Sequence, residues 1–169
     1  MVLQAVILCG GCNSGKSRTL RALRDNFLDS RNGFPQFRRR PVHLEISSLQ
    51  EQCRTCDEEG RRCVVRKMGE WVDIAREEGA SLLIVPFTMK YSRRSGELNE
   101  DCIRRPLEAL RRRGLLYYVV YLRKEHRSPK MNEEMDELMR ELFDRILESR
   151  RDGELRQARR IFQFISSIA

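Results

Sequence analysis

Four short apolar segments, rich in β-branched residues, interrupt an otherwise polar chain. Continuous apolar runs of this length are typical of strands that are buried on both faces of a parallel sheet. The segments between them carry apolar residues at helical spacing, so strand and helix alternate along the chain. This alternation predicts an α/β fold, a three-layer α/β/α sandwich around a mainly parallel sheet of about four to five strands. The predicted strands cover residues 2–9, 42–46, 82–87 and 115–122.

The helical segments are punctuated by residues that break or end a helix. Residues 99–113 contain Pro106, which predicts either a kink or a new helix start at the proline. Apolar residues within 135–147 repeat on one helical face and predict a single later helix. A last helix is expected over residues 155–168. A chain of 169 residues can bury one full core, so we expect a single domain spanning residues 1–169.

Residues 10–17 have the sequence GGCNSGKS and lie between the first apolar segment and a helical pattern. They match the phosphate-binding pattern G-x-x-x-x-G-K-[ST], for which an ordinary glycine-rich turn is the alternative interpretation. Gly10 and Gly15 let the backbone curl, so that successive N–H groups converge on phosphates at a helix N-terminus. In this pattern Lys16 reaches the β and γ phosphates, and the Ser17 hydroxyl holds Mg²⁺. We therefore expect nucleotide contacts from Gly10, Gly11, Cys12, Asn13, Ser14, Gly15, Lys16, Ser17 and Arg18.

At this loop the sequence resembles the P-loop NTPase superfamily. The size and the number of predicted strands are similar to those of its small kinase branch, typified by adenylate, shikimate and polynucleotide kinases. The specific resemblance covers only residues 10–17. It implies that ATP binds together with Mg²⁺ and that catalytic groups lie at the carboxyl ends of the strands. GTP is not expected, because the chain has no N-K-x-D segment.

The chain departs from this family at the third predicted strand. A typical strand of this kind, the Walker B strand, ends in Asp, whereas here residues 82–85 run into Pro86, Phe87 and Thr88 without a carboxylate. Glu45, in the sequence VHLEIS, is the best replacement, because acids near that strand end in small kinases hold Mg²⁺ or act as a base toward the acceptor hydroxyl. A salt bridge from Glu45 to an arginine is the alternative interpretation.

Positive charge exceeds negative charge by eight at pH 7, and only five of the 33 basic residues are lysines. Phosphoryl transfer depends on positioning and charge neutralisation, so basic groups near the γ phosphate are expected to be catalytic. The candidates are Lys16, and Arg123 and Arg127 after the fourth strand. The arginine runs 38–40 and 111–113 would instead serve a nucleic-acid contact. Solvated helix faces, on which arginines pair with acids, are the simpler interpretation of most of this charge.

Six cysteines in a chain without a recognisable leader argue against a disulfide scaffold. Cys53, Cys56 and Cys63 form C-x-x-C followed by a third cysteine, a pattern that offers three ligands to Zn²⁺. A structural zinc site needs four ligands, so His43 or Cys102 would have to be recruited through the fold. Zinc is therefore an alternative to be tested, and ATP and Mg²⁺ are the expected cofactors.

These features predict an ATP-binding protein, first of all a small Mg-dependent kinase. Its phosphoryl acceptor would be a nucleotide, a nucleic-acid end or a small-molecule hydroxyl. The alternative is a P-loop ATPase or switch that binds a protein or nucleic-acid partner under ATP control, which the missing Walker B carboxylate supports. No apolar run approaches the roughly 18 residues that a membrane span needs, and no leader precedes the first strand, so we expect a soluble cytoplasmic protein without a membrane partner.

Overall fold

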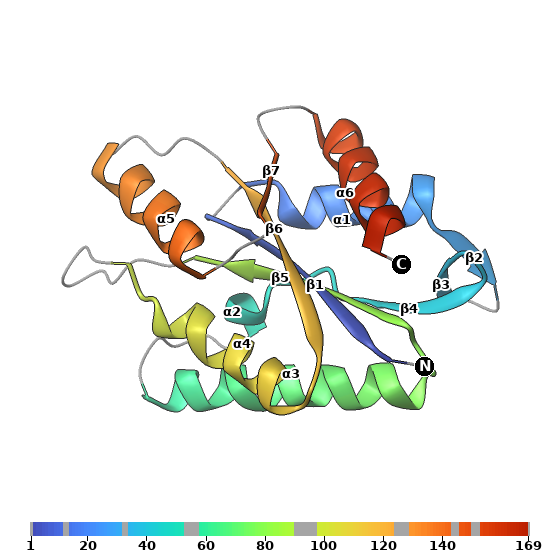
Figure 1. Ribbon diagram of the computed structural model, residues 1–169, viewed down its shortest axis with the longest axis horizontal. Helices are drawn as coiled ribbons and strands as arrows, with labels where there is room; N and C mark the ends of the chain where they lie inside the picture. Colours follow the sequence, from blue (N-terminus) through green and yellow to red (C-terminus); the bar gives the residue numbers. More distant parts are fainter. Residues whose placement is uncertain are drawn as a thin grey trace.

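The computed structural model describes residues 2–11, 14–31, 34–52, 58–89, 98–123, 129–142, 146–149 and 153–168. A central sheet lies between two layers of helices (Figure 1), which confirms the three-layer α/β/α sandwich. No helix among these residues is long and apolar enough to cross a bilayer. In chain order the elements are β1 (Gln4–Gly10), α1 (Lys16–Phe27), β2 (Asp29–Arg31), β3 (Phe34–Phe37), β4 (Arg40–Leu44), α2 (Leu49–Gln52), α3 (Glu58–Glu77), β5 (Leu82–Thr88), α4 (Asp101–Arg112), β6 (Leu116–Leu122), α5 (Pro129–Leu142), β7 (Ile146–Ser149) and α6 (Glu154–Ile168).

The described residues form one sheet of seven strands in the order β2-β3-β4-β5-β1-β6-β7. From β4 to β7 the neighbouring strands are parallel, whereas β2, β3 and β4 are joined as antiparallel hairpins. The four predicted strands correspond to β4, β5, β1 and β6, which lie next to one another in the middle of the sheet. Gly10, the last residue of β1, lies opposite Thr88 of β5 and Leu122 of β6. The carboxyl ends of the central strands therefore meet at one edge, where a doubly wound sheet binds its ligands.

Apolar side chains cover both faces of this sheet. Helices α3, α4 and α5 pack on one face against alternate strand residues such as Ile7 and Val85. Helices α1 and α6 pack on the other face against the intervening residues, among them Val6 and Ile84. Each central strand is buried on both sides, which is why the sequence shows continuous apolar runs rather than alternation.

Two expectations about the helices differ from the structure. Pro106 does not start a new helix, because α4 runs through it from Asp101 to Arg112, and a kink at the proline stays a prediction. The apolar pattern over 135–147 predicted one helix and was wrong at its end, since α5 stops at Leu142 and residues Ile146–Ser149 form β7. The parallel edge of β6 pairs with β7 and supplies backbone hydrogen bonds, so tertiary pairing overrides the local helical pattern.

Candidate phosphate-binding site

The glycine-rich segment connects the carboxyl end of β1 to the first turn of α1. A Cβ atom at Gly10 would overlap Ser14 Oγ and lie 3.0 Å from the Leu122 carbonyl oxygen, so only glycine fits there. Gly15 precedes α1 with a φ of 86°, a left-handed conformation that favours glycine. Ser14 N–H donates to the Gly11 carbonyl at 3.3 Å and closes the turn. These contacts support a curled loop rather than an extended connection. Cys12 and Asn13 lie outside the described residues.

Lys16 is the buried cation of the loop, with only 6% of its surface exposed. Its Nζ donates to the Gly10 carbonyl at 3.1 Å, to the Gly11 carbonyl at 2.8 Å and to Ser14 Oγ at 3.2 Å. All three acceptors are neutral oxygens of the same loop. A charged phosphate oxygen is a stronger hydrogen-bond acceptor than any of these three oxygens.

Ser17 and Arg18 follow the lysine in the first turn of α1. The Ser17 hydroxyl donates to the Ile46 carbonyl at 3.0 Å, which ties the helix start to the segment after β4. Arg18 is exposed and forms a 3.4 Å ion pair with Glu154 at the start of α6. The structure therefore brings Ser17 toward the strand ends, whereas Arg18 lies on the solvent side of α1.

Thr88 ends β5, the strand that lies beside β1. By strand alternation from Ile84, its side chain belongs to the sheet face that α1 covers. Thr88 is 2% exposed, and its Oγ1 has no hydrogen-bond partner. A buried hydroxyl without a partner is unusual and calls for an explanation such as a bound group. The position at which the sequence lacks a Walker B carboxylate is thus taken by a neutral hydroxyl.

Gln50 of α2 fixes the end of β5 from the other side. Its Oε1 accepts the Thr88 N–H at 2.7 Å, and its Nε2 donates to the Cys102 carbonyl at 2.8 Å. Cys102 is four residues before Pro106, which has no N–H to complete the helical bond to that carbonyl. The buried Gln50 amide therefore supplies the hydrogen-bond donor that Pro106 lacks. The sequence pattern does not identify Gln50 as a contact residue, and its only local signal is a proline inside a helical pattern.

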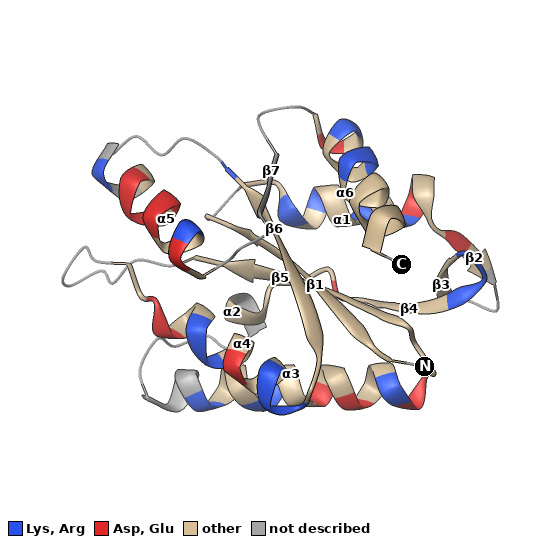
Figure 2. Ribbon diagram, viewed as in Figure 1, with Lys and Arg blue, Asp and Glu red and all other residues tan. Residues whose placement is uncertain are grey.

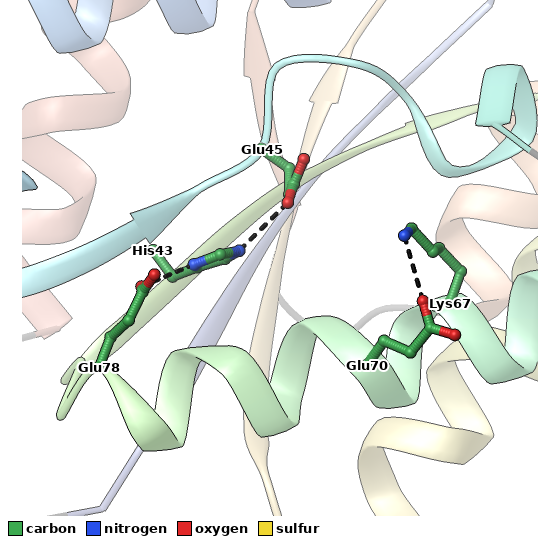
Figure 3. Close-up of polar contacts among 5 residues, drawn as sticks. All are labelled: His43, Glu45, Lys67, Glu70 and Glu78. Carbon is green, nitrogen blue, oxygen red and sulfur yellow. Dashed lines mark hydrogen bonds and ion pairs between the residues drawn. The ribbon is translucent and has the colours of Figure 1, made fainter.

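Glu45 belongs to a chain of polar contacts between β4 and α3 (Figure 3). Its Oε1 lies 3.2 Å from His43 Nε2, and His43 Nδ1 lies 2.8 Å from Glu78 Oε2. Burial lowers the pKa of His43, but the hydrogen bonds and charges of both carboxylates outweigh burial and raise it above its ordinary value. These contacts orient the Glu45 carboxylate on the α3 side of the sheet, whereas Ser17 lies on the α1 side. Figure 3 also shows Lys67, which donates to Glu70 one turn further along α3 at 3.1 Å.

Arg123 follows β6 directly and is held by a carboxylate of α5. Its Nε and Nη2 donate to the two oxygens of Asp136 at 3.2 and 2.6 Å, and Tyr121 OH donates to the same group at 3.3 Å. Helix α5 also approaches the loop, since a Cβ atom at Gly11 would lie 3.3 Å from the Met135 methyl carbon. Arg123 is therefore near the correct sheet edge but is already paired. Arg127 lies outside the described residues.

The cysteines have separate environments. Cys9 in β1 is fully buried, and this burial raises the pKa of its thiol to about 12, with a smaller opposing effect from Lys16. It is a packing residue that stays protonated. Cys63 lies half-buried on α3 and is disulfide-bonded, which differs from the expectation of reduced thiols. A disulfide sulfur is not a thiolate, so Cys63 does not have the form that the predicted zinc site needs. Cys53 and Cys56 lie outside the described residues, and within the described part of the chain no cluster of three or more His, Cys, Asp or Glu side chains could hold a metal ion.

No protein-family model matches the chain, and no curated protein sequence is significantly similar to it. Solved structures are similar in fold at low sequence identity. The APS kinase of Mycobacterium tuberculosis in complex with AMPPNP and APS has a TM-score of 0.56 at 10% identity, covering 98% of each chain. A sugar kinase from Janibacter has a TM-score of 0.52 at 14% identity, covering 97% of this chain and 95% of its own.

A third structure, the shikimate kinase of Acinetobacter baumannii in complex with shikimate, has a TM-score of 0.51 at 14% identity. It covers 98% of this chain and 94% of its own. At such identities the likeness concerns the arrangement of strands and helices, which extends over nearly the whole length in each comparison. These likenesses show that the chain has the same fold as these three kinases.

Proposed function

We propose that this chain is a small ATP-dependent phosphotransferase that moves the γ phosphate to a hydroxyl of a small molecule. The observation that supports this most directly is the buried Lys16 ammonium, held over a curled glycine loop at the N-terminus of α1. The N–H groups in the first turn of a helix, together with a lysine, are suited to a phosphate chain. The fold of three kinases over the whole length supports the same proposal.

The residues at the loop fit ATP with Mg²⁺. No side chain at Gly10 could share the space that Ser14 occupies, and none of the described residues lies within 4 Å of the place of a Cβ atom at Gly15. Bound ATP would supply the γ phosphate, and Mg²⁺ would neutralise charge on its oxygens. Lys16 would bind phosphate oxygens and Ser17 the metal ion, after exchanging its bond to Ile46. The unpartnered Thr88 hydroxyl is a further polar group at this edge.

Glu45 suits the acceptor side better than the metal. His43 orients its carboxylate on the α3 face of the sheet, away from the helix that carries Ser17. A carboxylate fixed by a second polar group can accept a proton from a hydroxyl that is held within hydrogen-bond distance. We therefore assign Glu45 the role of base or acceptor ligand and keep its role as an Mg²⁺ ligand as the alternative.

We infer the class of phosphoryl acceptor from the three kinases of similar fold. These are kinases for APS and shikimate by their complexes and a sugar kinase by name, so a small-molecule hydroxyl takes precedence over a nucleic-acid end. Because APS is itself a nucleotide, a hydroxyl of a nucleotide stays among the candidate acceptors. Arg123 would need to leave Asp136 to reach a phosphate, and we propose it as a group that binds the nucleotide during turnover. Arg127 is proposed for the same task from its position in the sequence alone.

The test is incubation with γ-labelled ATP and Mg²⁺ against a panel of sugars, polyols, nucleosides and 5′-hydroxyl oligonucleotides. We expect label in one acceptor class, a loss of at least 100-fold with Lys16→Ala, and little change with Lys130→Ala, a matched substitution at an exposed lysine of α5. ATP binding with release of free phosphate, or with no turnover, would refute the phosphotransferase. It would leave the P-loop switch, which the absence of a carboxylate at Thr88 favours.

A further inference from the structure

Charged residues are distributed unequally between the helices on the two faces of the sheet (Figure 2). On α1, α6 and residues 29–40, the described charged side chains outside the loop comprise nine arginines and three carboxylates. We call this surface the basic face. Its arginines are Arg18, Arg21, Arg24, Arg38, Arg39, Arg40, Arg156, Arg159 and Arg160, and its acids are Asp25, Asp29 and Glu154.

The opposite face is electrically balanced. Helices α3, α4 and α5 carry ten basic and ten acidic described side chains. Many are joined in ion pairs, such as Arg112 with Glu108 and Arg105 with Asp101. An arginine-rich composition caused by genome bias or heat adaptation would raise arginine on both faces. It does not explain why the excess of six positive charges lies on one of them.

The basic face is continuous across its elements. Helices α1 and α6 lie side by side, joined by the Thr19–Gln157 hydrogen bond of 2.7 Å. The turn between β3 and β4 reaches the far end of α6, where Arg38 donates to the Ser166 carbonyl at 3.4 Å. From Arg156 to Ser166 the helix rises by about 15 Å. The arginines thus line a surface of about that length rather than a single point.

Two arginines occupy backbone positions that other residues would fill at lower energy. Arg38 and Arg39 form the two-residue turn between β3 and β4 with φ values of 49° and 65°. A turn with two left-handed residues strongly prefers Asn-Gly or Gly-Gly. Strain of this kind persists where surrounding structure enforces it, and it often marks functional positions. Here it points to a requirement for the guanidinium groups at the end of the basic face.

We infer that the basic face binds the phosphate backbone of a double-stranded nucleic acid. Arginine matches phosphate with a planar pair of donors, and the face is rich in arginine rather than lysine. A duplex carries one negative charge per about 1.7 Å of its axis, so 15 Å of it carries about nine phosphates on its two strands. Those on the side that faces the protein meet the excess of six positive charges. This site lies outside the phosphate loop, and the inference does not depend on the proposed phosphotransfer.

The other chemical features of the face favour a duplex over different polyanions. Single-strand binding relies on exposed aromatic rings, whereas Phe27 and Phe37 pack against Phe162 of α6. Membrane binding relies on exposed apolar side chains, and on the described part of α1 and α6 the only large one is Leu155. The arginine run 111–113, which the sequence analysis grouped with 38–40, lies on the balanced face.

The test measures the affinity for a labelled 20-base-pair duplex by fluorescence anisotropy between 50 and 200 mM salt. With about six phosphates contacted, binding should weaken about 10³-fold over this range. The triple variant Arg21→Gln, Arg156→Gln and Arg159→Gln should weaken only about 40-fold over it, because about three contacts remain. At 50 mM salt the variant should bind at least tenfold less tightly than the unaltered chain.

The matched control is Arg105→Gln, Arg112→Gln and Arg140→Gln, which removes the same charge from the balanced face. We expect it to stay within threefold of the unaltered chain at each salt concentration. Lys16→Ala should also keep the affinity, since the phosphate loop is a separate site. Equal loss in both triple variants would show a response to net charge and overturn the inference. So would absence of duplex binding at 50 mM salt, loss with Lys16→Ala, or binding only to single strands or to anionic vesicles.

Discussion

Replacing Gln50 by leucine is the most discriminating test of how the edge of the sheet is held. Leucine has a similar volume but neither accepts nor donates, so the Thr88 N–H and the Cys102 carbonyl each lose a buried partner. A buried polar group left without its partner costs about 1–3 kcal/mol. The carbonyl keeps a second lone pair, so we expect the lower end of the range for it and a total of about 3 kcal/mol.

The expected loss corresponds to a Tm lower by roughly 6–12 °C for a chain of this size. Urea unfolding followed by fluorescence measures it directly, because Trp71 is the only tryptophan and is 1% exposed. The matched control is Gln157→Leu, which removes another buried glutamine whose partner is Thr19 on the opposite face. Gln157→Leu should also lower the unfolding free energy, but its effect should not depend on whether residue 106 is proline.

Pro106→Ala then tests the proposed cause. Alanine restores a backbone N–H that can donate to the Cys102 carbonyl in the regular helical pattern. Alanine should stabilise the Gln50→Leu protein by about 1 kcal/mol more than it stabilises the unaltered protein, and it should show no such excess with Gln157→Leu. Additive effects within about 0.5 kcal/mol, or a loss below about 1 kcal/mol for Gln50→Leu, would refute the reasoning.

Three further predictions concern single sites. Because the pKa of His43 is raised, its stabilising contribution is complete below about pH 6.5 and is lost as pH rises through the folded-state pKa. The difference in unfolding free energy between the unaltered protein and His43→Gln should therefore shrink from pH 6 to pH 9. A difference that stays constant over this range would contradict the prediction. Thr88→Val removes a buried hydroxyl without a partner and should stabilise the free protein by about 1 kcal/mol while weakening ATP binding in calorimetry, so unchanged ATP affinity would exclude a role in the site. Arg38→Asn with Arg39→Gly places residues that favour the left-handed conformation in the turn and should raise the unfolding free energy by about 1 kcal/mol. The same double substitution should lower the affinity for the duplex. An unchanged affinity would show that the turn takes no part in duplex binding.

The sequence was sufficient for the centre of the fold because the relevant signals are local. Continuous apolar runs identify β4, β5, β1 and β6, and the eight residues 10–17 identify a turn between strand and helix. The ends of the sheet were not predicted. Strands β2, β3 and β7 have three or four residues each, and pairing with a neighbouring edge rather than their own pattern makes them strands.

The candidate site divides in the same way. Lys16 and Ser17 follow from a contiguous motif, and the structure places both at the loop. Gln50 depends on a carbonyl 52 residues away, and the orientation of Glu45 depends on His43 and on Glu78, the residue that follows α3. Contacts between distant segments follow no fixed spacing in the sequence, so motifs do not predict them. Glu45 could therefore be chosen as a candidate from the sequence, whereas its hydrogen-bond partners could not be predicted.

The Lys16 ammonium already donates hydrogen bonds to three oxygens of its own loop. Any ligand that binds the ammonium must therefore replace these bonds. A neutral sugar or nucleoside offers only uncharged acceptors, as do the three loop oxygens already bonded to Lys16. Ionised oxygens form hydrogen bonds about twice as strong, so exchange is favourable only for an anion. Ligands should therefore be ranked by the charge of their phosphate chain, triphosphate before diphosphate before monophosphate, and selection by charge would precede any recognition of the base.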